Sequence, residues 1–130
     1  MSSNRISIIL TSDKREPLQM AAMIASVGAV SGSEVTVFVS MNALQFFLND
    51  CTAQARPEGP MGEAMARKNV PPFMVLFEQA VELGDARILP CSMAMDVLEI
   101  APQQLKPFVG EAMGLTKFLD DARDGQVWSF

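Results

Sequence analysis

Hydrophobic and polar positions along this chain follow two alternating patterns, one typical of buried strands and one typical of helices. Short apolar runs rich in β-branched residues, each bounded by polar residues, prolines or glycines, predict strands. Longer stretches with apolar residues on one or more helical faces predict the helices between them. Strands are expected at residues 6–10, 35–39, 86–89 and 126–130, and a brief extended piece at residues 107–109. Helices are expected from residues 13–17 to about 30 and at residues 43–48, 73–83, 93–100 and 111–123, with one helical turn at residues 63–68.

The order of these elements predicts a single α/β domain that spans residues 1–130. Strands that alternate with helices build right-handed βαβ units, whose parallel sheet is covered by helices on both faces. The stretch between residues 49 and 72 is the least regular part of the chain, because it carries six prolines and glycines. Loops of this length in small domains are usually functional or mobile.

Composition and charge exclude several classes of function. Hydrophobic residues make up 49% of the chain and charged residues 19%, which argues against disorder. The net charge of −5 argues against nucleic-acid backbones and anionic membranes as main partners. Histidine is absent, which removes Ser-His-Asp and Cys-His catalytic arrangements and His-containing zinc sites. The sequence carries neither a nucleotide-binding glycine loop nor an acidic cluster for a divalent cation, so we expect no cofactor and no metal.

Cysteine usage bears on the cellular compartment. Two cysteines are too few for a disulfide framework or for a four-thiolate metal site. The sequence contains no signal-peptide pattern and no run of 18 unbroken apolar residues. We therefore expect reduced thiols in a cytoplasmic protein.

The candidate site lies at the ends of the predicted strands, because open α/β sheets bind ligands just beyond the carboxyl ends of their strands. Cys91 follows the third strand and opens directly into a helix, where backbone N–H groups and the helix dipole favour a thiolate. The alternative is that Cys91 is a small buried hydrophobe, as most free cysteines are. Without a histidine base, Cys91 suits thiol exchange better than acyl transfer. Ser12, Ser40 and Asn42 follow the other strands as candidate substrate-binding residues, and Lys14, Arg15 and Lys68 are candidate cations for the thiolate.

Cys51 and the methionines each allow two interpretations. Cys51 is a candidate second thiol, or an incidental surface residue whose neighbour Asp50 opposes a thiolate. The methionines near the candidate site either form an adaptable apolar rim around Cys91 or pack in the core and between subunits. These methionines are Met41, Met61, Met65, Met93 and Met95.

The stretch from Ile88 to Leu98, which reads ILPCSMAMDVL, resembles the cysteine motif of the DsrE/DsrF-like superfamily. It is most similar to the branch in which Met-x-Met-Asp-Val follows the cysteine. The apolar first helix, the second strand VTVFVS and the C-terminal stretch from Gly114 to Phe130 also resemble the family pattern. Glu99 departs from it, because glycine is expected at that position, and a strained turn is therefore expected to be absent there.

The resemblance implies a three-layer sandwich with a five-stranded, mainly parallel sheet, assembled into trimers or hexamers. It also implies that Cys91 carries a persulfide or a thiosulfonate, with the backbone N–H groups of Ser92 and Met93 stabilising the charged species. Implied partners are a TusA-like sulfur carrier or a rhodanese, with thiosulfate, tetrathionate or polysulfide as inorganic donors.

The leading hypothesis is therefore a cytoplasmic sulfur carrier or sulfurtransferase that acts through Cys91 in sulfur oxidation or sulfur relay. Whether such a carrier counts as an enzyme stays open. Two alternatives also stay open: a non-catalytic oligomeric binding module of a sulfur-trafficking complex, and a dithiol redox protein that uses Cys51 and Cys91.

Overall fold

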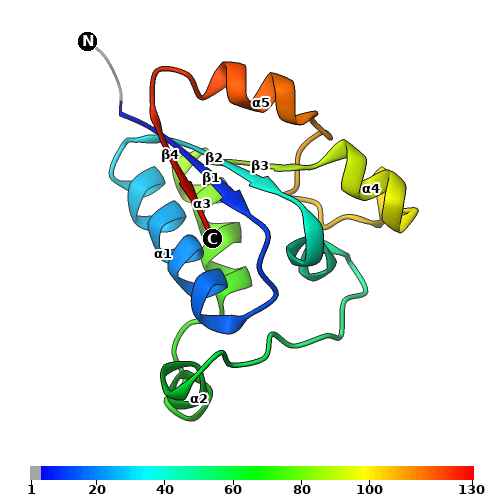
Figure 1. Ribbon diagram of the computed structural model, residues 1–130. Helices are drawn as coiled ribbons and strands as arrows, with labels where there is room; N and C mark the ends of the chain where they lie inside the picture. Colours follow the sequence, from blue (N-terminus) through cyan, green and yellow to red (C-terminus); the bar gives the residue numbers. More distant parts are fainter. Residues whose placement is uncertain (1–3) are drawn as a thin grey trace.

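The computed structural model describes residues 4–130, and Figure 1 shows a twisted parallel sheet with helices on both sides. The strands are β1 (Arg5–Leu10), β2 (Glu34–Val39), β3 (Arg87–Pro90) and β4 (Gln126–Ser129), in the spatial order β3-β2-β1-β4. All three strand pairs are parallel. The α-helices are α1 (Arg15–Val30), α2 (Pro60–Arg67), α3 (Phe73–Gly84), α4 (Ser92–Leu98) and α5 (Leu115–Asp121). Two 3₁₀ helices, η1 (Met41–Phe47) and η2 (Pro102–Gln104), complete the described elements.

The two faces of the sheet carry different side chains because successive residues of a strand point to opposite sides. Ile6 and Val35 face α1, since a Cβ added to Gly28 of α1 would lie 3.2 and 3.3 Å from their side chains. Phe38 faces α5, where its ring stacks on Phe118 with the centroids 4.8 Å apart. The sheet is thus the middle layer, with α1 and α3 on one side and α5 on the other, which confirms the predicted layered α/β architecture (Figure 1).

Close approach of two helices shapes the layer formed by α1 and α3. A Cβ at Gly84 would lie 2.5 Å from the Cβ of Ala29 and 2.6 Å from its backbone carbon. Only glycine fits there, because the neighbouring atoms belong to a backbone that cannot rotate away. Asp85, the next residue, closes α3 in the left-handed conformation.

The five-stranded sheet that the resemblance implies is wrong: within residues 4–130 the sheet has four strands. The brief extended piece expected at residues 107–109 is wrong as well, because Pro107 and Phe108 lie in a turn, which the chain leaves by residue 110. There it runs beside β3, with the N–H of Gly110 donating to Ile88 (2.7 Å) and the N–H of Met113 donating to Pro90 (2.9 Å). The pairing with β3 is limited to one isolated bridge, between Cys91 and Met113. Because these residues bond to β3, α5 begins at Leu115 rather than at residue 111.

The turn after α4 also differs from expectation. Glu99 adopts the left-handed conformation (φ 55°, ψ 47°) and closes the helix. The strained turn expected to be absent is therefore present, formed by a residue with a side chain. Its N–H donates to Asp96 at 3.2 Å, and the N–H of Ile100 donates to Met95 at 2.9 Å, which satisfies carbonyls at the helix end.

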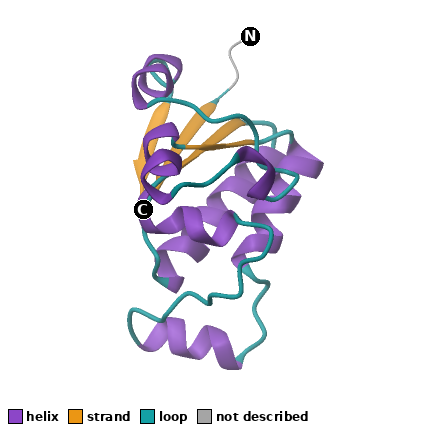
Figure 2. Cartoon of the chain, turned by 90° about the vertical axis from the view of Figure 1, so that its right-hand side faces the viewer, coloured by secondary structure: helices purple, strands orange, loops and turns teal. Residues whose placement is uncertain are grey.

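A carboxylate of α1 helps to anchor the irregular stretch between η1 and α3. Glu16 accepts hydrogen bonds from the N–H groups of Glu58 (2.7 Å), Gly59 (2.8 Å) and Gly62 (2.9 Å). These donors surround the start of α2, where the helix dipole also favours a negative charge. Figure 2 shows α2 at the end of the molecule opposite the strands. Among the described residues, no helix has the length and apolar character needed to cross a membrane.

Candidate functional site

Cys91 lies at the junction between β3 and α4, and its backbone is held on both sides. Its N–H donates to the carbonyl of Val39 in β2 at 2.8 Å, and its own carbonyl accepts the N–H of Met95 at 3.0 Å. The residue is the N-cap of α4 in extended conformation and is only 5% exposed. Both Cys91 and Cys51 are free thiols. The predicted placement of Cys91, at a strand end that opens into a helix, is thus what the structure has.

Strand register places Ser40 beside Cys91. Leu10, Val39 and Pro90 are paired across β1, β2 and β3, so Ser40 and Cys91 come next on neighbouring strands. Their side chains fall on the sheet face that carries Phe38 and α5. Ser40 is buried, and its side chain does not cap η1. A buried hydroxyl therefore accompanies the thiol at the carboxyl edge of the sheet.

Two backbone N–H groups at the start of α4 remain without acceptors. The expectation that Ser92 supplies one of them is wrong, because its N–H donates to the carbonyl of Met113 at 3.0 Å. Met93 and Ala94 follow, and no acceptor for their N–H groups occurs in the described part of the chain. Unpaired donors at a helix start stabilise negative charge nearby. Met93 and Ala94 are therefore the residues whose N–H groups are unpaired at this helix start in the described part of the chain.

Ser12 and Asn42 serve local turns. The hydroxyl of Ser12 accepts the N–H of Lys14 at 2.9 Å, and the exposed Asn42 offers its carbonyl to the side chain of Gln45 at 2.8 Å. The Cys51 thiol lies 3.7 Å from the carbonyl of Ala53. None of the three has a hydrogen bond to Cys91 among the described residues.

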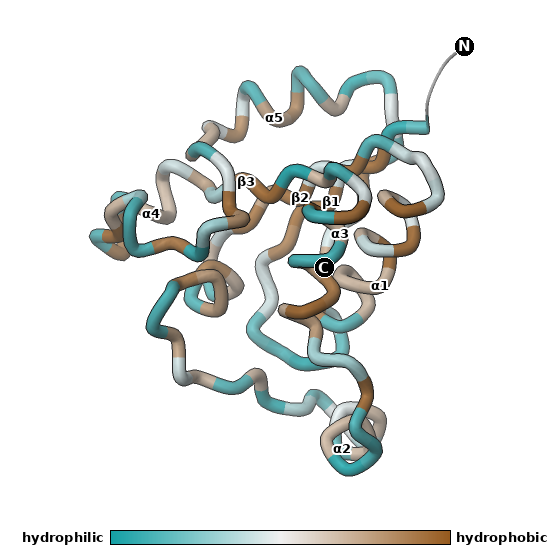
Figure 3. Tube along the Cα trace, turned by 180° about the vertical axis from the view of Figure 1, so that it is seen from behind, coloured by the Kyte–Doolittle hydropathy of each residue, from teal (hydrophilic) through white to brown (hydrophobic). Residues whose placement is uncertain are grey.

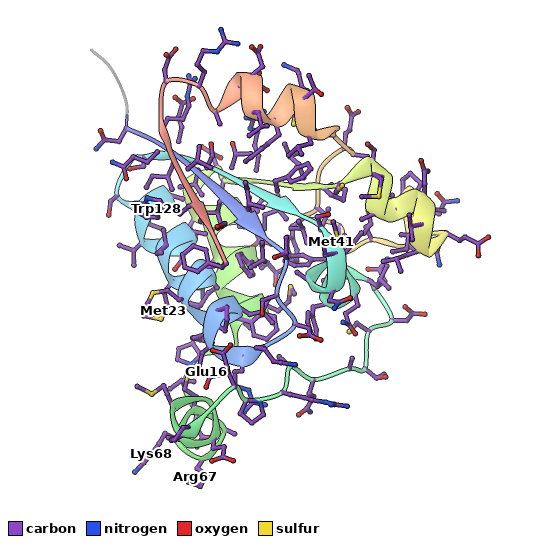
Figure 4. The ribbon with its side chains drawn as sticks, viewed as in Figure 1. Glu16, Met23, Met41, Arg67, Lys68 and Trp128 are labelled. Atoms are coloured by element: carbon purple, nitrogen blue, oxygen red, sulfur yellow. The ribbon has the colours of Figure 1, made fainter. Side chains whose placement is uncertain are left out.

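The candidate cations are engaged elsewhere. Lys14 pairs with Asp13 at 3.3 Å. Arg15 donates to the carbonyls of Ala55 (2.9 Å) and Gly62 (3.0 Å), which helps to fasten the irregular stretch to α1. Lys68 follows α2, and Figure 4 shows it at the far end of the molecule from α4. The backbone N–H groups at the start of α4, rather than these three side chains, are therefore the positive dipoles described next to Cys91.

Two methionines lie at the site: Met41, which the sequence predicted there, and Met113, which it did not. Met113 lies along β3 and bridges to Cys91, a contact that depends on the course of residues 110–113. Met41 follows Ser40 with a left-handed backbone (φ 54°) and an exposed side chain. Figure 4 shows Met41 at the end of β2, on the side of the molecule where α4 lies. Met93, the second residue of α4, is exposed as well. Met61 and Met65 belong to α2 and lie away from this edge.

Comparisons with solved structures support the fold. The protein of unknown function MTH1491 from Methanobacterium thermoautotrophicum is similar over 98% of this chain and 100% of its own, with a TM-score of 0.71 and 8% identity. The YchN protein from E. coli is similar over 98% of this chain and 99% of its own, with a TM-score of 0.65 and 15% identity. A search of curated proteins found no significant match.

The family comparison covers the segment that holds the candidate site. A model of the DsrE/DsrF/DrsH-like family matches residues 54–130, which run from the irregular stretch through α2, α3, β3 and α4 to β4. The matched segment includes Cys91, the start of α4 and Met113. It spans more than half of the chain. The chain belongs to the DsrE/DsrF/DrsH-like family.

Proposed function

We propose that this protein is a cytoplasmic sulfur carrier or sulfurtransferase that loads sulfane sulfur or a thiosulfonate on Cys91 and passes it to partner thiols. Membership of the family implies a role in sulfur relay or transfer in general terms. The observation that carries the specific proposal is the free thiol of Cys91 at the β3–α4 junction, next to two unpaired N–H groups.

The chemistry needs no base and no cofactor. The Cys91 thiolate attacks the outer sulfur of a donor persulfide, R–S–SH, forms Cys91–S–SH and releases R–S⁻, which takes up a proton. With tetrathionate, attack on a central sulfur gives Cys91–S–S–SO₃⁻ and releases thiosulfate. An acceptor thiolate then attacks the sulfur bound to Cys91 and regenerates the Cys91 thiolate. The N–H groups of Met93 and Ala94 stabilise the anions at each step.

A partner protein must reach the Cys91 thiol to exchange sulfur with it. Cys91 is nearly buried, whereas Met41 and Met93 extend into solvent on neighbouring elements. Flexible thioether side chains suit contacts with a peptide segment of variable sequence. We take the partner to be a small carrier protein of the TusA type or a rhodanese, whose sulfur-bearing loop displaces these methionines.

An exposed apolar face supports assembly into a homo-oligomer, a trimer or hexamer by the family pattern. Between residues 17 and 30 no side chain of α1 is charged, and the exposed ones are all apolar. Contiguous apolar surface of this kind marks an interface. Figure 3 shows hydrophobic colouring along α1. The exposed apolar residues are Met20, Met23, Val27 and Val30.

Intact-mass measurement tests the loading reaction. Wild-type protein, Cys91→Ser and Cys51→Ser are each incubated with thiosulfate, tetrathionate, polysulfide or a persulfidated carrier. We expect an adduct that dithiothreitol removes in the wild type and in Cys51→Ser, and none in Cys91→Ser. The adduct mass identifies the cargo.

Other outcomes of the same experiment favour the alternatives. Absence of an adduct with every donor, from natively folded protein, contradicts the carrier function and leaves the oligomeric binding module. A mass loss of two hydrogens that both substitutions abolish indicates a disulfide between Cys51 and Cys91 and favours the dithiol redox protein.

A further inference from the structure

A cavity of about 710 Å³ opens at the amino end of the sheet, where the strands meet α5 and the C-terminal ends of α1 and α3. Its volume lies in the range of small-molecule sites. The starts of β1, β2 and β3 contribute Ser7, Thr36 and Arg87, and α5 contributes Phe118. These strand residues share the sheet face of Cys91, which lies at the opposite end of the same face. A middle row of apolar residues separates the two regions, and it consists of Ile9, Phe38 and Leu89.

The inner part of the cavity carries hydroxyl groups on an otherwise apolar sheet. Thr36 is buried, and its hydroxyl oxygen accepts a hydrogen bond from the Nη2 atom of Arg87 at 3.1 Å. Ser7 is 3% exposed and lines the cavity. Its hydroxyl can donate a hydrogen bond to a polar group inside the cavity.

The Arg87 guanidinium has N–H donors that are not engaged by a carboxylate of the described chain. Three of the carboxylates at the rim already have cationic partners, in the ion pairs Glu34–Arg5, Asp121–Lys117 and Asp120–Arg123. In the described part of the chain no carboxylate lies within 4.0 Å of the Arg87 guanidinium. The hydrogen bond from Lys117 is the main cause that lowers the pKa of Asp121, and the charges of Arg87 and Arg5 add to it. Both guanidinium groups thus act on the side of the cavity formed by α5.

The hydrogen-bond donors inside the cavity favour an anionic group of a ligand, whereas the carboxylates at its rim favour a cationic group. Arg87 with the hydroxyls of Thr36 and Ser7 forms a donor set that fits a carboxylate, which guanidinium groups bind in a planar, two-pronged geometry. The lining as a whole carries four carboxylates against two guanidinium groups, so a purely anionic ligand meets repulsion at the rim. Asp85, at the end of α3, has no cation within 4.0 Å in the described residues and can accept an ammonium group.

We propose that this cavity binds a small zwitterion of the amino-acid class, with its carboxylate on Arg87, Thr36 and Ser7 and its ammonium group toward Asp85. Phe118 and the apolar parts of the lining leave room for a side chain. The site lies at the other end of the sheet face from Cys91 and does not use the thiol.

Isothermal titration calorimetry with the L-amino acids tests the proposal on the full chain. We expect at least one of them to bind saturably, and its decarboxylated amine and its deaminated acid to bind about tenfold more weakly or worse. Arg87→Met and Ser7→Ala should each weaken binding by about tenfold or more, because each removes a donor to the carboxylate. Arg67→Met, which removes an exposed arginine from α2, is the matched control and should bind as the wild type does.

Three results would overturn the site: no saturable binding of any amino acid to folded wild-type protein, equal binding of the amine or the acid, or unchanged binding in both variants. Circular dichroism checks folding, and Ser7→Ala decides the test where Arg87→Met fails to fold. Cys91→Ser should bind the amino acid with wild-type affinity. That variant separates failure of this site from failure of sulfur loading.

Discussion

Met41 adopts a backbone conformation that few residues with a side chain tolerate, one position after the hydroxyl beside Cys91. Its φ of 54° lies in the left-handed region, which costs a non-glycine residue about 1–2 kcal/mol. Strain of this kind persists where the surrounding structure fixes it, often at functional sites. The left-handed turn lets η1 begin directly after Ser40 and leaves the thioether in solvent at the edge that holds the thiol.

Replacing Met41 by glycine should separate partner recognition from stability. Met41→Gly relieves the left-handed strain, so the free energy of unfolding should stay within about 1 kcal/mol of the wild type. Loading of Cys91 from tetrathionate should be unchanged, whereas transfer from a persulfidated carrier protein should slow by about tenfold because the apolar contact is lost. Denaturant titration and time-resolved intact mass measure the two effects.

The matched control retains the strain and removes the same side chain. Met41→Ala should slow carrier transfer as much as Met41→Gly does. The Met41→Ala protein should unfold at a lower denaturant concentration than the Met41→Gly protein, because it keeps the left-handed strain. If both variants accept sulfur from the carrier at the wild-type rate, Met41 takes no part in recognition.

At the residue scale the sequence predicted the site in part. Cys91 and Ser40 lie where the carboxyl-edge rule puts them, because that rule depends only on strand order and chain direction. Ser92 was mispredicted because its N–H is occupied by the carbonyl of Met113, a residue 21 positions later whose course no local pattern reveals. Ser12 lies after the correct strand but folds into a local turn, since short hydroxyl side chains compete for nearby backbone groups.

Among the elements, α1 and α2 are joined by polar contacts rather than by an apolar core: the Glu16 carboxylate accepts the N–H of Gly62, and the Arg15 guanidinium donates to the carbonyl of Gly62. The hydrogen bond from Glu58 is the largest cause that lowers the pKa of Glu16, and those from Gly59 and Gly62 add to it against the opposing effect of burial. A Cβ at Gly62 would lie 2.5 Å from this carboxylate. Glycine at position 62 is thus what allows the carboxylate to reach three N–H groups.

Acid should detach α2 from α1 before the core unfolds. A carboxylate whose pKa is lowered by folding stabilises the folded form above its unfolded pKa, and this contribution is lost as pH falls through the folded value. For Glu16 the unfolded value is about 4.5, so the loss is expected below pH 4.5. Amide hydrogen exchange should show Gly59 and Gly62 losing protection below that pH while β1 and β2 remain protected.

Substitutions at the same contact should reproduce the acid effect at neutral pH. Glu16→Gln removes the charge, and Gly62→Ala pushes the carboxylate out of its place, so both should expose these amides at pH 7. Glu63→Gln, in the first turn of α2, is the control and should leave protection unchanged. Equal protection in Glu16→Gln and the wild type at neutral pH would show that the carboxylate does not hold α2.

Most elements follow from the hydrophobic pattern, and the extended piece expected at residues 107–109 shows where that pattern fails. β1, β2 and α1 formed as predicted because dense apolar runs bounded by polar residues leave few other ways to bury them. Residues 110–113 hold the position of an edge strand, but they bond to β3 with only part of a regular ladder. Whether such a segment is counted as a strand depends on tertiary hydrogen bonds, which local sequence does not encode.

For the whole molecule, surface charge and apolar surface are segregated. The chain carries a net charge of −5, yet the exposed face of α1 from Met20 to Val30 has no charge at all. Identical acidic subunits can meet at such a face without bringing like charges together. β4 adds to this face. Trp128 is paired with Ile8, so its side chain lies on the α1 side of the sheet. It is more than a third exposed, because β4 is an edge strand of the sheet.

Placing a charge in this face should dissociate the oligomer without unfolding the subunit. Val27 and Met61 are both 67% exposed, the first on the uncharged face of α1 and the second on α2. In size-exclusion chromatography with light scattering, we expect the wild type and Met61→Glu to run as oligomers and Val27→Glu to run as a monomer with an unchanged circular dichroism spectrum. The charge would be buried without a partner in the assembly, which costs several kcal/mol at each interface. A wild type that stays monomeric at every concentration, or a Val27→Glu variant that stays assembled, would show that the uncharged face of α1 is not where subunits meet.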